Sequence, residues 1–180
     1  EKILREGYEE GGVLVRVAKS HIRVGTFQLA QISNNKENIK ELLDYSIKRL
    51  YPDLYNNNNR YLIFYEKVVE SQMSLILEWQ RVGFIHGVMN TDNMALSGET
   101  IDYGPCAFLD EYNPNKVFSS IDHKGRYSFN NQPKIGLWNL ARLAETFLHL
   151  IDNDENLAIK KVEKILKKFE NKYYDLWLSM

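Results

Sequence analysis

The sequence predicts an α+β fold that is mostly helical. Apolar residues recur every three or four positions along several long stretches, which is the pattern of amphipathic helices. Residues 13–18 instead alternate apolar and polar side chains after Gly11 and Gly12, which is typical of a strand. With 180 residues, 44% of them hydrophobic and 12% aromatic, the chain can bury a substantial core and is expected to be ordered.

The first third of the chain is expected to hold two helices after the strand at 13–18. Ser20 is a candidate N-cap for a short helix that follows the strand. A turn at 34–37 leads into a second helix over 39–51, which Pro52 ends. The four asparagines at 56–59 are typical of a solvated loop.

The longest predicted helix covers residues 60–82 and would be about 30 Å long at 1.5 Å per residue. Gly83 follows it, at the position where glycine favours a helix end. We interpret its apolar stripe as core rather than as a cofactor contact; the stripe consists of Tyr61, Tyr65, Val68, Val69, Gln72, Leu75, Ile76 and Trp79. Two short strand-like pieces around Gly98 follow, and the second ends at Ile101.

The second half of the chain is expected to contain one long irregular segment and two helices. Residues 108–132 hold several turn formers and no clear period, and so long a segment without elements usually has a function or is mobile. Helices are predicted over 134–151 and 155–178; their stripes are Leu137, Leu140, Ala144, Leu148 and Ile151 in one, and Val162, Leu166, Phe169, Tyr173 and Leu176 in the other. The lysines at 160, 161, 164, 167 and 168, balanced by Glu163 and Glu170, indicate a solvated helix face.

Charge and cysteine content exclude several classes of protein. A net charge of -1, from 23 basic and 24 acidic residues, argues against a partner such as nucleic acid or an anionic membrane surface. The single cysteine, Cys106, excludes an intrachain disulfide and a cysteine-rich zinc site, and fits a reducing compartment such as the cytoplasm, or the mitochondrion in a eukaryote. No stretch reaches the roughly 20 apolar residues that a membrane span needs.

The most informative motif begins at His86 and ends at Asn93, and an Asp-Tyr-Gly triplet that starts at Asp102 follows it. Protein kinases place the His and Asn of their catalytic loop seven positions apart, as here, and follow them with Asp-Phe-Gly. Val88 stands where such a kinase has its catalytic aspartate, and the nearest carboxylate is Asp92. The spacing therefore predicts a phosphoryl-transfer or nucleotidyl-transfer loop that lacks the usual catalytic residue.

The residue types in this motif suit metal-assisted chemistry on phosphate. Magnesium prefers hard oxygen ligands, and Asn93 and Asp102 can supply an amide oxygen and a carboxylate. Asp92, beside Asn93, can accept or orient the proton of an incoming hydroxyl. An Asn-Thr-Asp-Asn run is also typical of a simple turn, because these side chains bond their own backbone. His86 is interpreted as a structural hydrogen-bonding residue and not as a catalytic one.

Four blocks of the sequence resemble the selenoprotein O family, also called YdiU. They cover residues 15–27, 83–94, 100–105 and 122–133, and the similarity runs from about Gly11 to Leu143. The resemblance implies a pseudokinase with a protein-kinase-like fold. Both lobes of such a fold need more chain than this, so we expect a fragment: residues 1–33 form the junction between lobes, and residues 34–180 form most of the helical C-terminal lobe.

The resemblance also implies an activity and a set of site residues. Family members bind ATP in an orientation flipped relative to ordinary kinases and transfer AMP to hydroxyl side chains of Ser, Thr or Tyr in other proteins. Carried over to this chain, Asp92 is the proton acceptor, Asn93 and Asp102 bind magnesium, with manganese as the alternative, and Asp102 also lies at the nucleotide. Arg16 and Arg23 match arginines that contact the phosphates, and a guanidinium suits that role because it forks two donors onto phosphate oxygens. Without the resemblance, both arginines read as surface charge beside an edge strand.

The sequence departs from the family pattern in two places. No Gly-rich loop or strand lysine lies upstream of the motif, so we expect this fragment to be inactive alone. Phe118 stands where the resemblance places a cysteine in some bacterial relatives, so the resemblance does not extend to their disulfide switch, while oxidation of Cys106 stays open if its thiol is exposed. Two other functions stay open: ordinary phosphotransfer by a divergent kinase, and nucleotide binding by a non-catalytic scaffold.

Overall fold

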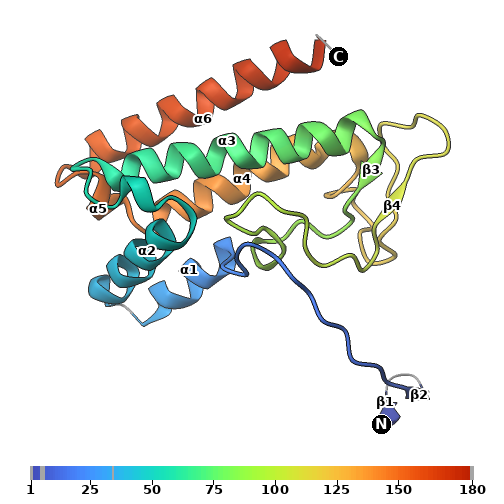
Figure 1. Ribbon diagram of the computed structural model, residues 1–180. Helices are drawn as coiled ribbons and strands as arrows, with labels where there is room; N and C mark the ends of the chain where they lie inside the picture. The colour runs from blue at the N-terminus through green and yellow to red at the C-terminus, as the bar shows by residue number, and fades with distance from the viewer. Residues whose placement is uncertain (1, 5–6, 34, 179–180) are drawn as a thin grey trace.

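The computed structural model describes residues 2–4, 7–33 and 35–178, without the side chains of Tyr174 and Leu176. Its fold is α+β and mostly helical, as predicted (Figure 1). The helices are α1 (Val24–Ile32), α2 (Lys36–Leu50), α3 (Arg60–Arg81), α4 (Gln132–Glu145), α5 (Leu148–Ile151) and α6 (Glu155–Leu178). The strands form two antiparallel pairs, β1 (Lys2–Leu4) with β2 (Tyr8–Glu10) and β3 (Phe84–Ile85) with β4 (Ala107–Phe108).

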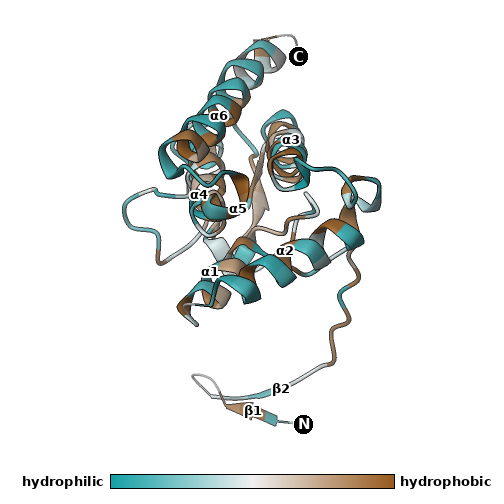
Figure 2. Cartoon of the chain, turned by 90° about the vertical axis from the view of Figure 1, so that its left-hand side faces the viewer, coloured by the Kyte–Doolittle hydropathy of each residue, from teal (hydrophilic) through white to brown (hydrophobic). Residues whose placement is uncertain are grey.

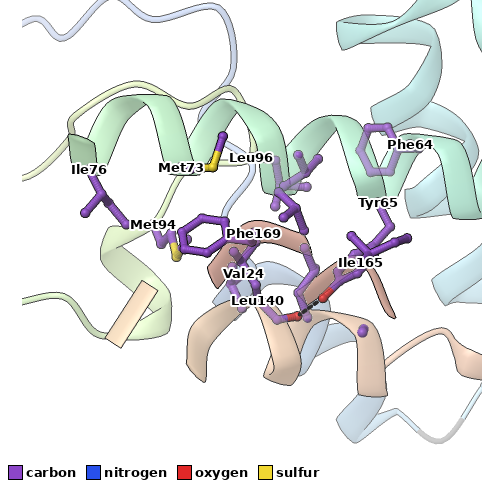
Figure 3. Close-up of a cluster of buried hydrophobic side chains, with 14 of the residues drawn as sticks. Val24, Phe64, Tyr65, Met73, Ile76, Met94, Leu96, Leu140, Ile165 and Phe169 are labelled. Atoms are coloured by element: carbon purple, nitrogen blue, oxygen red, sulfur yellow. Dashed lines mark hydrogen bonds between the residues drawn. The ribbon is translucent and has the colours of Figure 1, made fainter. Parts of the chain in front are cut away.

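Helix α3 packs against both α4 and α6, which also contact each other (Figure 1). The apolar faces of the helices turn toward one another, and the polar faces turn outward (Figure 2). In the core they share, Phe64 and Tyr65 of α3 lie fully buried, and Leu140 of α4 meets Tyr65, whose hydroxyl donates to the Leu140 carbonyl oxygen at 3.1 Å (Figure 3). Burial raises the pKa of Tyr65, so this hydroxyl stays a donor. The predicted stripe of α3 is therefore the core of the fold.

Three of the helix predictions are confirmed to within a few residues. Helix α2 begins slightly earlier than predicted because the Asn35 side chain accepts a hydrogen bond from the Glu37 backbone N–H at 3.0 Å. Helix α3 ends before Gly83, whose φ of 70° breaks the helical path. Helix α6 has the predicted bounds. Of its predicted stripe, the Leu176 side chain lies outside the described residues, as does residue 34 of the predicted turn.

The predicted helix over 134–151 is wrong in one respect, because the structure divides it into α4 and α5. Phe147 leaves the helical conformation, with a φ of -136°, and its ring is fully buried against the rings of Phe27 and Tyr65. The Thr146 hydroxyl donates to the Leu143 carbonyl oxygen at 2.7 Å, which satisfies a carbonyl at the end of α4. Burial of the Phe147 ring offsets the loss of helical hydrogen bonds at this point.

The predicted strand over 13–18 is wrong. Residues 11–19 form an extended arm without regular structure, and Val13 and Val17 are 96% and 90% exposed. The arm leads away from the helices to the β1–β2 hairpin (Figure 1). Alternation favours a strand only where a neighbouring strand supplies hydrogen bonds, and none of the described residues pairs with the arm. Ser20 is not a helix cap either, since its hydroxyl accepts from the Ile22 N–H and α1 begins at Val24.

The strand predicted to end at Ile101 is also wrong. Residues 94–101 contain no strand, and their β-type pairing is limited to an isolated bridge between Ala95 and Arg23. The predicted irregular segment at 108–132 is largely confirmed, with one short 3-10 helix at Phe129–Asn131 before α4 begins. The Arg126 guanidinium lies 4.9 Å from the centre of the Trp138 ring, so this residue anchors the segment on α4.

Among the described residues, none of the helices combines the length and the apolar character that crossing a membrane requires. The division of the chain into a junction at 1–33 and a lobe at 34–180 remains a prediction, and so does the protein-kinase-like arrangement.

Candidate active site

His86 joins the two halves of the predicted motif. It is fully buried, and its Nε2 lies 2.7 Å from the carbonyl oxygen of Ile101, the residue before Asp102. Its Nδ1 accepts from the Val88 backbone N–H at 3.4 Å, so the ring proton is on Nε2 and donates to Ile101. Burial lowers the pKa of His86 and keeps the ring neutral. The structural role predicted for His86 is confirmed.

Buried side-chain amides fix the backbone on both sides of the loop at 86–93. The Gln132 side chain accepts from the His86 N–H at 3.0 Å and donates to the Phe84 carbonyl oxygen at 2.9 Å. Asn139 donates to the Met89 carbonyl oxygen at 3.0 Å, and Gln72 donates to the carbonyl oxygen of Ala95. Sequence reasoning missed these tethers, although a glutamine within the apolar stripe of α3 was a signal for one of them.

The candidate metal ligands are Asn93 and Asp102. The Asn93 side-chain N–H donates to the Val88 carbonyl oxygen at 3.0 Å, which leaves its Oδ1 as the atom available to a cation. Asp102 has a φ of 60°, a left-handed conformation that is rare for a residue with a side chain and that is often found at functional sites. Hydrogen bonds from Asn93 to Val88, from Val88 to His86 and from His86 to Ile101 connect the two positions.

The donor set fits magnesium rather than a softer metal. Within the described part of the chain, no three His, Cys, Asp or Glu side chains gather to hold a metal. An amide oxygen and one carboxylate are both hard ligands, and magnesium commonly takes one or two such groups from the protein and the rest from phosphates and water. The pair Asn93 and Asp102 is therefore compatible with a magnesium ion that arrives with a nucleotide.

Asp92 lies on the short 3-10 helix Thr91–Asn93, next to the start of α1. Its backbone N–H donates to the Asn90 side chain at 3.0 Å, which sets the turn. Its carboxylate rests on Gly25, and a Cβ at position 25 would lie only 2.1 Å from Asp92 Oδ1. Only a glycine leaves room for this carboxylate at the N-terminal end of a helix, where the helix dipole favours negative charge.

Arg23 immediately precedes α1 and lies in the same region as Asp92. Its neighbours bond the segment that follows the loop: the Val24 N–H donates to the Met94 carbonyl oxygen at 3.1 Å, and the Leu96 N–H donates to the Ile22 carbonyl oxygen at 2.9 Å. A surface groove results, and it is lined by His21, Arg23, Gly25, Thr26, Gln28, Leu29, Ile32, Thr91 and Asp92. The buried Nε of Arg23 has no hydrogen-bond partner among the described residues. The structure thus brings Arg23 and Asp92, predicted from distant parts of the sequence, to one groove.

Arg16 is exposed on the arm and does not line this groove, so its assignment remains a prediction. Sequence reasoning did not single out Gly25 or Thr91, because their role depends on a contact between segments more than 60 positions apart.

The family model described as "Protein adenylyltransferase SelO" matches residues 1–180. The chain belongs to the SelO family.

Curated SelO relatives named "Protein nucleotidyltransferase YdiU" are similar over nearly the whole chain. The protein from Bacillus cytotoxicus is 55% identical over 179 residues, the one from Rhizobium etli is 53% identical over 179 residues, and the one from Clostridium perfringens strain 13 is 51% identical over 179 residues. Each alignment covers 99% of this chain and 36% of the relative. The chain therefore spans about a third of the length of the curated relatives that it matches.

In this SelO chain, the Lys116 ammonium lies over the ring of Phe118, 5.2 Å from its centre. Cys106 is half-buried, and its thiol donates to the Tyr103 carbonyl oxygen at 3.5 Å.

Proposed function

We propose that this SelO protein transfers AMP from ATP to the hydroxyl groups of Ser, Thr or Tyr side chains in other proteins. Family membership supports nucleotidyl transfer, and the relatives are named protein nucleotidyltransferases. The observation that carries the proposal is the groove that both Arg23 and Asp92 line, with Asn93 next in the chain. The Arg23 guanidinium, which can bind phosphate, and the Asp92 carboxylate, which can accept a hydroxyl proton, therefore belong to one groove.

Asp92 supplies the proton acceptor in this proposal. The acceptor oxygen forms a bond to the α-phosphorus of ATP, the bond from that phosphorus to the bridging oxygen of the β-phosphate breaks, and pyrophosphate leaves. The hydroxyl proton passes to the Asp92 carboxylate, which is exposed and therefore accessible to a protein substrate. Because Asp92 rests on Gly25, its position is defined before the substrate arrives.

The remaining site residues bind the triphosphate. Asn93 Oδ1 and the Asp102 carboxylate would hold magnesium, with manganese as the alternative, and the bound cation would neutralise charge on the phosphates. The Arg23 guanidinium can direct charge-assisted hydrogen bonds at the phosphate oxygens. Arg16 joins it when the arm approaches the nucleotide.

The proposed architecture is a protein-kinase-like fold in which residues 1–33 form the junction between lobes and residues 34–180 form most of the C-terminal lobe. The activity belongs to the full-length protein, and this fragment alone is expected to be inactive. The single cysteine is consistent with a reducing compartment, and we propose the cytoplasm, or the mitochondrion in a eukaryote.

ATP labelled on either the α- or the γ-phosphate tests the function directly. The full-length protein is incubated with magnesium and each label in turn, and the label on protein is counted. Retention of the α-label supports AMP transfer. Transfer of the γ-label alone would indicate kinase chemistry, and no transfer would favour the scaffold that Val88 allows.

Asp102→Ala tests the metal assignment in the same assay. Loss of a metal ligand should reduce transfer by about 100-fold or more, because stabilisation of phosphate charge is a large part of such catalysis. Asp53→Ala is the matched control, since Asp53 is exposed on the 3-10 helix Pro52–Leu54 and does not line the groove. An Asp102→Ala protein as active as this control would rule out the metal role.

A further inference from the structure

The backbone of the candidate catalytic loop is held at its middle by a side chain of α4. Gln132 bonds the loop at its entry and Gln72 bonds the chain after its exit, whereas Asn139 donates to the Met89 carbonyl oxygen at 3.0 Å. Met89 precedes Asp92 by three residues and Ala95, the partner of Gln72, follows it by three, so Asn139 supplies the nearest of these bonds on the N-terminal side of Asp92. The bond joins residues 50 positions apart in the sequence.

This hydrogen bond lies in a dry environment. Asn139 is 0% exposed and Met89 is 3% exposed. Water cannot replace the donor there, and a hydrogen bond is stronger in such surroundings than at the surface. One side chain therefore determines where the Met89 carbonyl points.

Stability alone does not account for an asparagine at this position. Its Oδ1 is buried and accepts no hydrogen bond from any residue that the structure describes. A buried acceptor without a partner is unfavourable, and the neighbours on the same helix, Leu140 and Leu143, are apolar and fully buried. A leucine of similar size would avoid the unpaired oxygen, so the donor to Met89 is what the asparagine provides.

We propose that Asn139 is a positioning residue for AMP transfer. Through its hydrogen bond to Met89, it fixes the backbone that places Asp92 at the groove. Asn139 is buried and does not line the groove, so it has no contact with ATP or with the acceptor. Without its donor, the Met89 carbonyl is released and the turn at Thr91–Asn93 shifts with it. The nucleotide contacts of Arg23 come from a different segment and are unaffected.

The test compares Asn139→Leu with wild type in the full-length protein. The kcat for α-label transfer should fall by about 10- to 100-fold, since small displacements of a catalytic group have effects of this size. The KM for ATP should change less than kcat, because Arg23 is untouched and Asn93 is only one of the two proposed metal ligands. Hydrogen exchange of the Val88, Asp92 and Asn93 amides, each bonded within the loop, should become at least about tenfold faster.

Thr146→Val is the matched control, because it removes another buried side-chain hydrogen bond, to Leu143 at the C-terminal end of α4 and away from the loop. This variant should keep both the kcat and the loop exchange of wild type. Both proteins should melt within about 4 °C of wild type, so that a difference in kcat does not reflect unfolding.

An Asn139→Leu protein with wild-type kcat and wild-type loop exchange would overturn the proposal. If that variant does not fold, Asn139→Ser replaces it, since the serine hydroxyl is too short to reach Met89, and the same two outcomes decide. The activity readout rests on the proposed function, but the exchange readout does not. If wild type transfers no α-label, the proposed function fails, and unchanged exchange in the variant would still reject the tether.

Discussion

Gly25→Ala separates the position of Asp92 from the stability of the fold. The Cβ that this change adds would lie 2.1 Å from Asp92 Oδ1 and 3.0 Å from Asp92 Cγ, whereas real Cβ contacts essentially never fall below 3.0 Å. The carboxylate must therefore move by about 1 Å, and a displacement of that size can reduce catalysis by about 100-fold. Position 25 is in the first turn of α1, where alanine is favoured over glycine by up to about 1 kcal/mol. We expect kcat to fall by about 10- to 100-fold without loss of stability.

The assay measures α-label transfer and thermal unfolding of the full-length Gly25→Ala protein in parallel. Thr26→Ala is not a suitable control, because the Thr26 hydroxyl accepts from the Arg23 N–H. Gln31→Ala is better, since Gln31 lies in the same helix, is exposed and does not line the groove. Full activity in Gly25→Ala, with a normal melting temperature, would refute the claim that contact with Gly25 sets the position in which the Asp92 carboxylate acts.

Two further changes test the phosphate contact and the buried histidine. Arg23→Gln keeps side-chain donors but removes the charge, so ATP should bind about 10- to 100-fold more weakly by calorimetry, and an unchanged Kd would exclude Arg23 from the phosphate site. Burial lowers the pKa of His86, so the unfolded chain binds a proton more readily than the folded chain. The neutral ring therefore contributes to the stability of the fold above a pH of about 6.5, and this contribution is lost as the pH falls below that value. The urea midpoint of wild type should drop more between pH 7.5 and 5.5 than that of His86→Gln; equal drops would show that His86 is not responsible.

The sequence predicts the long helices well because the apolar periodicity that indicates each helix lies within the helix itself. Helix α3 repeats its apolar period over 22 residues, and Gly83 marks its end, so no knowledge of distant residues is needed. The same holds for α6. The break at Phe147 could not be predicted, because the period of α4 continues into α5 and only the rings of Phe27 and Tyr65 explain the departure.

The strand at 13–18 illustrates the opposite case. Its alternation is a local pattern, but a strand depends on hydrogen bonds from another segment, and the described residues offer none. The spacing from His86 to Asn93 did predict a loop with a structural histidine. It could not predict that Gly25 would receive the Asp92 carboxylate or that Asn139 would hold Met89, because both contacts join segments that lie far apart in the sequence.

The central claim is that Asp92 accepts the proton of the hydroxyl that attacks ATP. Asp92→Asn is the most direct test, because the amide has the same shape and cannot accept that proton. With α-labelled ATP and the full-length protein, kcat should fall by about 100- to 10,000-fold, the range for loss of a general base, while the KM for ATP changes little. An Asp92→Asn protein that transfers AMP at the wild-type rate would contradict the account.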